Sequence, residues 1–141
     1  MSLSSRKIRS MFISKYIVKV EKFAESHYIK KFSKKYKNYW DVTFKGIFLE
    51  LERFNEFMKT DHVNLISFHK NISIFKINFR LAKTNFSRKT SGNRCIISLN
   101  RNNNEIKILL MYHKNDIDGK NETAAWKKII RDNYDDYDFL K

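Results

Sequence analysis

The sequence predicts an α+β domain in which a small antiparallel sheet carries helices on one face. Three observations predict it. Short segments rich in β-branched and aromatic residues flank a long stretch with helical periodicity. Hydrophobic residues make up 42% of the chain, which is enough for a folded core. The length suits a single domain over residues 1–141 rather than two. The predicted order is strand, helix, helix, strand, strand, strand, helix.

The N-terminal part is predicted to form one strand and two helices. Residues 1–11 are expected to be a loose terminus, and residues 12–20, FISKYIVKV, have the composition of a strand. From Glu21 an amphipathic helix is predicted, with a buried side at Ala24, Tyr28, Phe32 and Tyr36. Its lysines are interpreted as a mostly solvated face, comprising Lys30, Lys31, Lys34, Lys35 and Lys37. Asp41 can cap the second helix, whose apolar stripe is Phe44, Ile47, Phe48, Leu51 and Phe54.

Three further strands and one helix complete the predicted fold. Residues 61–71 form a less regular connection with room for a short strand. Residues 75–81 alternate, so that one side is apolar and the other presents Lys76, Asn78 and Arg80. Residues 94–99 and 106–113 are the next strands, joined by an asparagine-rich turn. Asn121 can cap the last helix, whose buried side is Ala125, Trp126, Ile129 and Ile130.

The charge of the chain indicates a polyanionic partner. Lysine and arginine number 29 against 15 acidic residues, for a net charge of +14, which favours nucleic acid or another anionic surface. Abundant lysine also follows from AT-rich coding DNA, but that bias does not explain a local cluster. In residues 74–94, IFKINFRLAKTNFSRKTSGNR, no carboxylate accompanies the six cations Lys76, Arg80, Lys83, Arg88, Lys89 and Arg94.

Several classes of function are disfavoured by the residues. The single cysteine, Cys95, cannot form an internal disulfide, and no segment resembles a signal peptide or a membrane span, so a cytoplasmic protein without a membrane partner is expected. Cys95 is expected to be a buried structural thiol. The histidines show no metal-ligand spacing, so no metal is predicted. A single glycine, Gly92, cannot build a phosphate-cradling loop, and no cofactor is predicted.

The segments FRLAK, KTSGNRCIISL and ILLMYHKND, with the element order, resemble the RelE/ParE superfamily of toxins from type II toxin-antitoxin systems. The closest likeness is to the RelE or HigB-like branch, and it extends over roughly residues 12–130. The basic glycine turn of that branch corresponds to residues 89–94, with Gly92 as its structural turn. Ser91 stands where the family often has a first glycine, and Asn93 where it often has an aromatic residue.

The resemblance implies a metal-independent endoribonuclease, or mRNA interferase, that cuts mRNA on the ribosome. It also implies a small antitoxin that covers the basic surface. The corresponding positions are Arg80 on the first matching strand, Arg94 after the turn, and Tyr112, Lys114 and Asp116 at the end of the last strand. Oligomeric state and the identity of the antitoxin are left open.

The chemistry of the residues agrees with RNA cleavage. Attack of a 2′-hydroxyl on its own phosphate needs a base, an acid and positive charge on the phosphorane oxygens. Arg80 and Arg94 are the candidates for that charge, and Tyr112, His113 and Lys114 for proton transfer. The cations Lys76, Lys83, Arg88 and Lys89 would add to the phosphate field, and Phe86 could stack on an unpaired base.

Two other functions fit the same residues. A ParE-like gyrase inhibitor would share the fold without the nuclease chemistry. A noncatalytic RNA-binding or ribosome-binding module would use the cations only to neutralise phosphates. The acidic and aromatic tail, residues 132–141, adds a further hypothesis. It could fold onto the basic face and mimic RNA, or it could be a frayed terminus.

Overall fold

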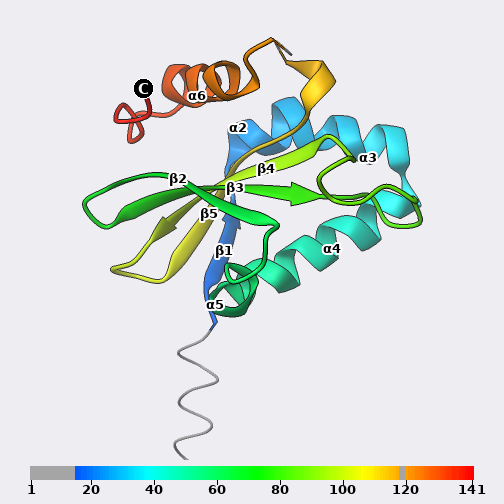
Figure 1. Cartoon of the computed structure of the whole chain (residues 1–141), viewed down its shortest axis with the longest axis horizontal. Helices are drawn as coiled ribbons and strands as arrows, with labels where there is room; N and C mark the ends of the chain where they lie inside the picture. The colour runs from blue at the N-terminus through cyan, green and yellow to red at the C-terminus, as the bar shows by residue number, and fades with distance from the viewer. Residues whose placement is uncertain (1–14, 118–119) are drawn as a thin grey trace, which may run out of the picture.

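A five-stranded mixed sheet forms the centre of the computed structural model, which describes residues 15–117 and 120–141 (Figure 1). The predicted loose terminus, residues 1–11, lies outside the described residues. The strand order is β1-β5-β4-β3-β2. The strands are β1 (Ile17–Val20), β2 (Val63–His69), β3 (Ile72–Phe79), β4 (Asn93–Asn100) and β5 (Glu105–His113). Neighbouring pairs from β2 to β5 are antiparallel, whereas β1 runs parallel to β5.

The helical segment between β1 and β2 covers one side of the sheet. Its parts are α2 (Lys22–Ala24), the π-helical turn η1 (Glu25–Ile29), α3 (Lys30–Tyr36), α4 (Asn38–Glu52) and α5 (Phe54–Phe57). The chain breaks between α3 and α4 at Lys37, whose φ of 45° departs from the helical region. Aromatic rings dominate the contact with the sheet, and Phe54 lies against Phe75 of β3 with ring centroids 4.9 Å apart. We call this side of the sheet the α4 face.

The last helix, α6 (Glu122–Asn133), packs on the other side of the sheet, which we call the α6 face. Figure 1 shows α6 and α4 on opposite sides of the strands. Trp126 and Ile130 are fully buried there against Ile74, Ile96 and Leu110 of the sheet. The η1 turn lies where the two layers meet, because Ile29 belongs to the α4-face core while Tyr28 packs on the α6-face core.

The predicted α+β class and the order of the main elements are confirmed, and three details differ. The sheet is mixed rather than antiparallel, because β1 pairs in parallel with β5. The connection at residues 61–71 contains a full edge strand, β2. Helices cover both faces rather than one. The reason is visible in β4 and β5, whose consecutive buried residues are apolar on both sides, and such strands need cover on both.

The tail folds back onto the α6 face, so a frayed terminus was the wrong alternative. Tyr137 and Leu140 are buried, and the Tyr137 hydroxyl lies 3.0 Å from Ser98 Oγ of β4. Arg131 of α6 donates a hydrogen bond to the Leu140 carbonyl at 2.5 Å. The anchors are therefore aromatic and aliphatic side chains, while Asp135, Asp136 and Asp138 stay exposed.

No helix among the described residues is long and apolar enough to cross a membrane.

Candidate functional site

The candidate site begins with a row of three side chains across the sheet. Asn78 of β3 pairs with Arg94 of β4, and Arg94 pairs with Tyr112 of β5. Residues that lie directly opposite each other in antiparallel strands point to the same side. All three therefore lie on the α6 face, at the end of the sheet where the β3–β4 loop emerges. Lys76 lies one row further along the same face and is half-buried.

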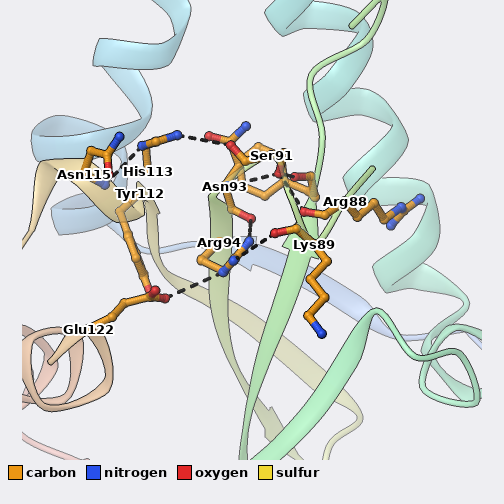
Figure 2. Close-up of polar contacts among 10 residues, drawn as sticks. Arg88, Lys89, Ser91, Asn93, Arg94, Tyr112, His113, Asn115 and Glu122 are labelled. Carbon is orange, nitrogen blue, oxygen red and sulfur yellow. Dashed lines mark hydrogen bonds and ion pairs between the residues drawn. The ribbon is translucent and has the colours of Figure 1, made fainter. Parts of the chain in front are cut away.

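Arg94 is buried and holds the basic loop in place. Its Nη2 donates to the Lys89 carbonyl at 3.2 Å and its Nη1 to the Asn93 carbonyl at 3.1 Å (Figure 2). Its Nε lies 3.6 Å from Glu122 Oε2, an ion pair in which the arginine side chain is 10% exposed and the glutamate 22%. The sequence predicts a phosphate-binding arginine here, and the structure gives its guanidinium a carboxylate partner and two carbonyl partners.

Tyr112 shares that carboxylate. Its hydroxyl donates to Glu122 Oε2 at 2.7 Å, and the ring is buried beneath α6. Burial and, after it, the hydrogen bond to the Glu122 carboxylate raise the pKa of Tyr112 well above its ordinary range. In this arrangement Tyr112 is a neutral hydrogen-bond donor rather than a base.

His113 is held at both ring nitrogens by backbone groups. Its Nδ1 accepts from the Asn115 N–H at 3.1 Å, and its Nε2 lies 3.1 Å from the Ser91 carbonyl oxygen (Figure 2). Since the N–H must donate and the carbonyl must accept, the geometry fits the tautomer with its proton on Nε2. The predicted proton-transfer role for His113 requires one of these two bonds to open.

The glycine turn shapes the loop as the sequence predicts. Gly92 has a φ of +78°, and a Cβ there would lie 2.6 Å from His113 Nε2. Its carbonyl accepts from the Lys114 N–H at 2.8 Å, which ties the loop to the end of β5. Ser91, at a position where the resemblance leads one to expect glycine, donates from Oγ to the Phe79 carbonyl at 2.5 Å. The hydroxyl thus stabilises the loop in a way that glycine cannot.

Three of the predicted cations are exposed around this row. Arg80 follows β3, Lys89 lies in the loop, and Lys114 begins the 3-10 turn η2 (Lys114–Asp116) after β5. Within residues 15–117 and 120–141, no ion pair is found for any of the three. Solvent, or an anion, can reach all three of them directly.

The remaining predicted RNA-binding residues lie apart from the row. Arg88 Nη2 forms an ion pair of 2.8 Å with Glu50 of α4, and Figure 2 shows its side chain directed away from Arg94. Lys83 lies over the ring of Tyr39, with its Nζ 5.3 Å from the ring centroid. Phe86 is 61% exposed in the loop. The loop therefore does not bring all of its cations to one point.

Other reactive groups in the described chain offer no second centre. Cys95 is fully buried, and burial raises the pKa of its thiol, as expected of a structural cysteine. Among residues 15–117 and 120–141, no three His, Cys, Asp or Glu side chains are grouped to hold a metal ion.

Glu122 is the site residue that the sequence did not reveal. It stands in the first turn of α6, where a carboxylate is common because it complements the helix dipole. That position explains its presence without any reference to Arg94. Its contact with Arg94 and Tyr112 depends on where α6 docks, and no local pattern reports that.

Comparison with known proteins bears on the fold. The chain is similar to the crystal structure of the archaeal RelE–RelB complex from Pyrococcus horikoshii OT3, with a TM-score of 0.51. This protein has a RelE-like fold. The likeness covers 71% of this chain and 96% of the other at 18% sequence identity, which concerns the fold alone. The fold implied by the sequence resemblance is confirmed. Comparisons with protein-family models and with curated proteins give no match.

Proposed function

We propose that this RelE-like protein is the toxin of a toxin-antitoxin pair and cleaves ribosome-bound mRNA without a metal ion. The observation that carries the proposal is the position of the basic loop on this fold. The loop is fixed by Arg94 and Gly92, and it borders the exposed cations Arg80, Lys89 and Lys114. A small antitoxin covering this surface is the proposed protein partner, in line with the RelE–RelB complex that shares the fold.

The proposed reaction is a transesterification within the RNA. The 2′-oxygen attacks the adjacent phosphorus and loses its proton to a base, while the 5′-oxygen leaves and takes a proton from an acid. The products are a 2′,3′-cyclic phosphate and a 5′-hydroxyl end. Arg80 and Arg94 are the proposed partners of the phosphorane oxygens, because a guanidinium can bind two of them at once.

Proton transfer is assigned to the end of β5. Lys114 is exposed, and it lies next to His113 and two residues from Tyr112. Entry of RNA would compete with Glu122 for Arg94, and it would thereby disturb the carboxylate to which the Tyr112 hydroxyl donates. The pH dependence of cleavage, measured in variants that each lack one of the three groups, identifies which acts as base and which as acid.

A noncatalytic RNA-binding role is the second candidate, and one observation favours it. Both His113 nitrogens and the Tyr112 hydroxyl are occupied by hydrogen bonds within the protein. If these bonds persist when RNA is bound, neither His113 nor Tyr112 is free to move protons, and of the three candidates only Lys114 remains. Such a module would bind RNA with a steep dependence on salt and leave it intact.

The test is controlled expression of the wild type and of variants, with growth and mRNA ends as readouts. Ends are mapped on a translated reporter and on the same message left untranslated. Arg94→Ala should abolish cleavage and toxicity. Because Arg94 also holds the loop, the exposed Arg80 and Lys114 are replaced by alanine in separate variants, and each should lower cleavage by about tenfold or more. Circular dichroism and thermal melting establish that each variant is folded.

Arg101→Ala is the matched control. Arg101 is an exposed arginine in the turn between β4 and β5, at the opposite end of the sheet from the row. Cuts confined to the translated message, lost in Arg94→Ala and kept in Arg101→Ala, are the expected result. A folded Arg94→Ala protein with full activity would overturn the assignment. Bound but uncut RNA would support the noncatalytic module instead.

A further inference from the structure

A pocket of about 210 Å³ lies beside the candidate site, between η1 and α3 on one side and the end of β5 with η2 on the other. Tyr112 and His113 line it from the strand, and Tyr28, Lys31, Lys35 and Tyr36 line it from the helical segment. The proposed function does not use these four helical residues. Pockets for drug-sized ligands measure roughly 300–1,000 Å³, so this smaller volume suits one base of an RNA strand whose sugar and phosphate lie at the rim.

The helical side of the pocket carries two exposed cations. Lys31 and Lys35 are four residues apart on α3 and therefore lie on one side of the helix. Their Nζ atoms are 5.6 Å from the centroid of the Tyr28 ring and 5.3 Å from that of the Tyr36 ring. Cation–π contacts of this kind keep each ammonium group beside an aromatic surface. Asp116 is the one acidic residue among the described residues that line the pocket.

The aromatic part of the wall is packed against further rings behind it. Tyr36 stacks on Phe32 with ring centroids 6.2 Å apart, and Phe32 stacks on the buried Trp40 at 4.9 Å. Tyr28 belongs to η1, and π-helical turns of this type occur frequently at functional sites. Burial raises the pKa of Tyr28, so its hydroxyl stays a neutral hydrogen-bond donor at physiological pH.

Rings and cations in one pocket match the chemistry of single-stranded RNA. Unpaired bases stack on aromatic side chains while lysines follow the phosphates. We propose that this pocket binds one nucleotide of the RNA. The Lys31 and Lys35 ammonium groups leave the Tyr28 and Tyr36 rings to bind the phosphate, and the base takes their place against the rings. The inference deepens the proposed function and rests on it, because Tyr112 and His113 belong to both. The bound nucleotide would adjoin the one whose 2′-hydroxyl attacks.

The helix supplies a matched control for the two lysines. Lys30 and Lys34 are exposed residues of the same helix, and neither lines this pocket. Lys31→Gln/Lys35→Gln and Lys30→Gln/Lys34→Gln thus remove the same charge from the same element. The first pair of lost charges faces the pocket and its tyrosines, and the second pair does not. General electrostatic attraction predicts equal effects, whereas a nucleotide site predicts a large effect for the first pair alone.

The experiment measures binding separately from cleavage. A fluorescent 2′-O-methyl RNA hexamer, which lacks the attacking hydroxyl, is titrated with full-length protein at fixed salt. We expect Lys31→Gln/Lys35→Gln to weaken binding by roughly tenfold or more, as for two lost phosphate contacts, and Lys30→Gln/Lys34→Gln by less than about threefold. Tyr36→Ala, checked for folding, should also weaken binding by about fivefold or more through lost stacking.

Inorganic phosphate and uridine 5′-monophosphate are titrated as well, to distinguish an RNA strand from a free phosphate or a free nucleotide as the ligand. If inorganic phosphate binds as tightly as uridine 5′-monophosphate, the rings do not contribute to binding, and their proposed role is overturned. If uridine 5′-monophosphate binds as tightly as the hexamer, the ligand is a free nucleotide rather than RNA, and the proposal is overturned. An equal loss of hexamer affinity in the two double-lysine variants would overturn the proposal that this pocket binds a nucleotide.

The nucleotide site and the proposed nuclease activity can be tested separately. Hexamer binding that depends on Lys31 and Lys35, with no cleavage of unmodified RNA on or off the ribosome, supports the pocket and defeats the nuclease. Cleavage that is identical in the two lysine pairs supports the nuclease and defeats the pocket.

Discussion

The two faces of the sheet are built from different chemistry. The α4 face is an aromatic and aliphatic core in which Phe54, Phe75 and Trp40 are buried among other apolar residues. The α6 face has an apolar centre under Trp126, but its edge contains the buried ion pair of Arg94 and Glu122. The α4 face therefore depends mainly on packing, with a few polar contacts such as that of Thr43 with Ala82. The α6 face also has a charged group at its edge that must be satisfied.

Buried polar atoms without a hydrogen-bond partner occur on both sides of the sheet, and more of them lie on the α6 face. Among the described residues, the buried side-chain atoms without a hydrogen-bond partner are Asn78 Oδ1, Arg94 Nε and Trp126 Nε1 on the α6 face, Asn93 Oδ1 in the row of Phe79 on the α4 face, and Arg88 Nη1 in the loop. Buried polar atoms of this kind are rare in folded proteins and call for an explanation such as a ligand or water. Both faces therefore contain an apolar core, and the α6 face adds a polar site at its edge around Arg94 and Tyr112.

The largest expected effect is on the α4 face. Phe54→Ala removes a fully buried ring that contacts Phe75 and Tyr16, and it leaves a cavity. The free energy of unfolding should fall by about 3–5 kcal/mol. Urea denaturation followed by circular dichroism measures it. Phe68→Ala is the control, because Phe68 is 68% exposed on the edge strand, and it should change stability by less than about 0.5 kcal/mol. A loss below 1 kcal/mol for Phe54→Ala would contradict the assignment of the core.

Replacing one glycine in the loop and one in a helix compares how much each backbone conformation requires glycine. Gly92→Ala places a Cβ against His113 at a positive φ, and it should lower the free energy of unfolding by about 2–3 kcal/mol. Gly46→Ala is the counterpart in α4, where an added Cβ meets no atom within 4 Å. It should raise stability by about 0.5–1 kcal/mol, because alanine favours the helix. Equal effects in chemical denaturation would show that Gly92 has no special conformational role.

The smallest expected effect is the response of the α6 face to alkali. Burial is the main cause that raises the pKa values of Tyr112 and Tyr134 above the ordinary value of 10.0. The nearby carboxylate adds to it, which is Glu122 for Tyr112 and Glu21 for Tyr134. Above pH 10 the unfolded state releases protons that the folded state keeps, so stability is full below pH 10 and falls as pH rises. Each tyrosine adds up to about 1.4 kcal/mol per pH unit to that fall.

Denaturation at pH 9, 10 and 11 measures this slope. Tyr134→Phe removes one ionising hydroxyl, together with its 2.7 Å hydrogen bond to the Leu109 carbonyl. It should lower stability at pH 9 and make the decline above pH 10 shallower. The exposed Tyr39 supplies the control through Tyr39→Phe. The same slope in Tyr134→Phe as in the wild type would contradict the inference that the buried hydroxyl stays protonated in the folded state.

Much of the candidate site could be predicted from the sequence, because part of it is local. The strand period places Lys76 and Asn78 on one side of β3, and the basic turn places Gly92 beside Arg94. The partners of the cations could not be predicted, because they come from distant elements. Arg88 meets Glu50 of α4, and Arg94 meets Glu122 of α6, so the loop presents fewer free cations than its composition suggests.

The sequence by itself determined the α+β class, the apolar sides of the helices and strands, and the glycine turn, since periodicity and backbone preference act over a few residues. Only the tertiary structure decided that β1 lies parallel to β5, that α6 and the tail cover the second face, and that Lys31 and Lys35 share a pocket with His113. The physical reason is that a hydrophobic pattern shows that a surface must be covered but not which segment covers it. Charge pairing and pocket formation then follow from that docking.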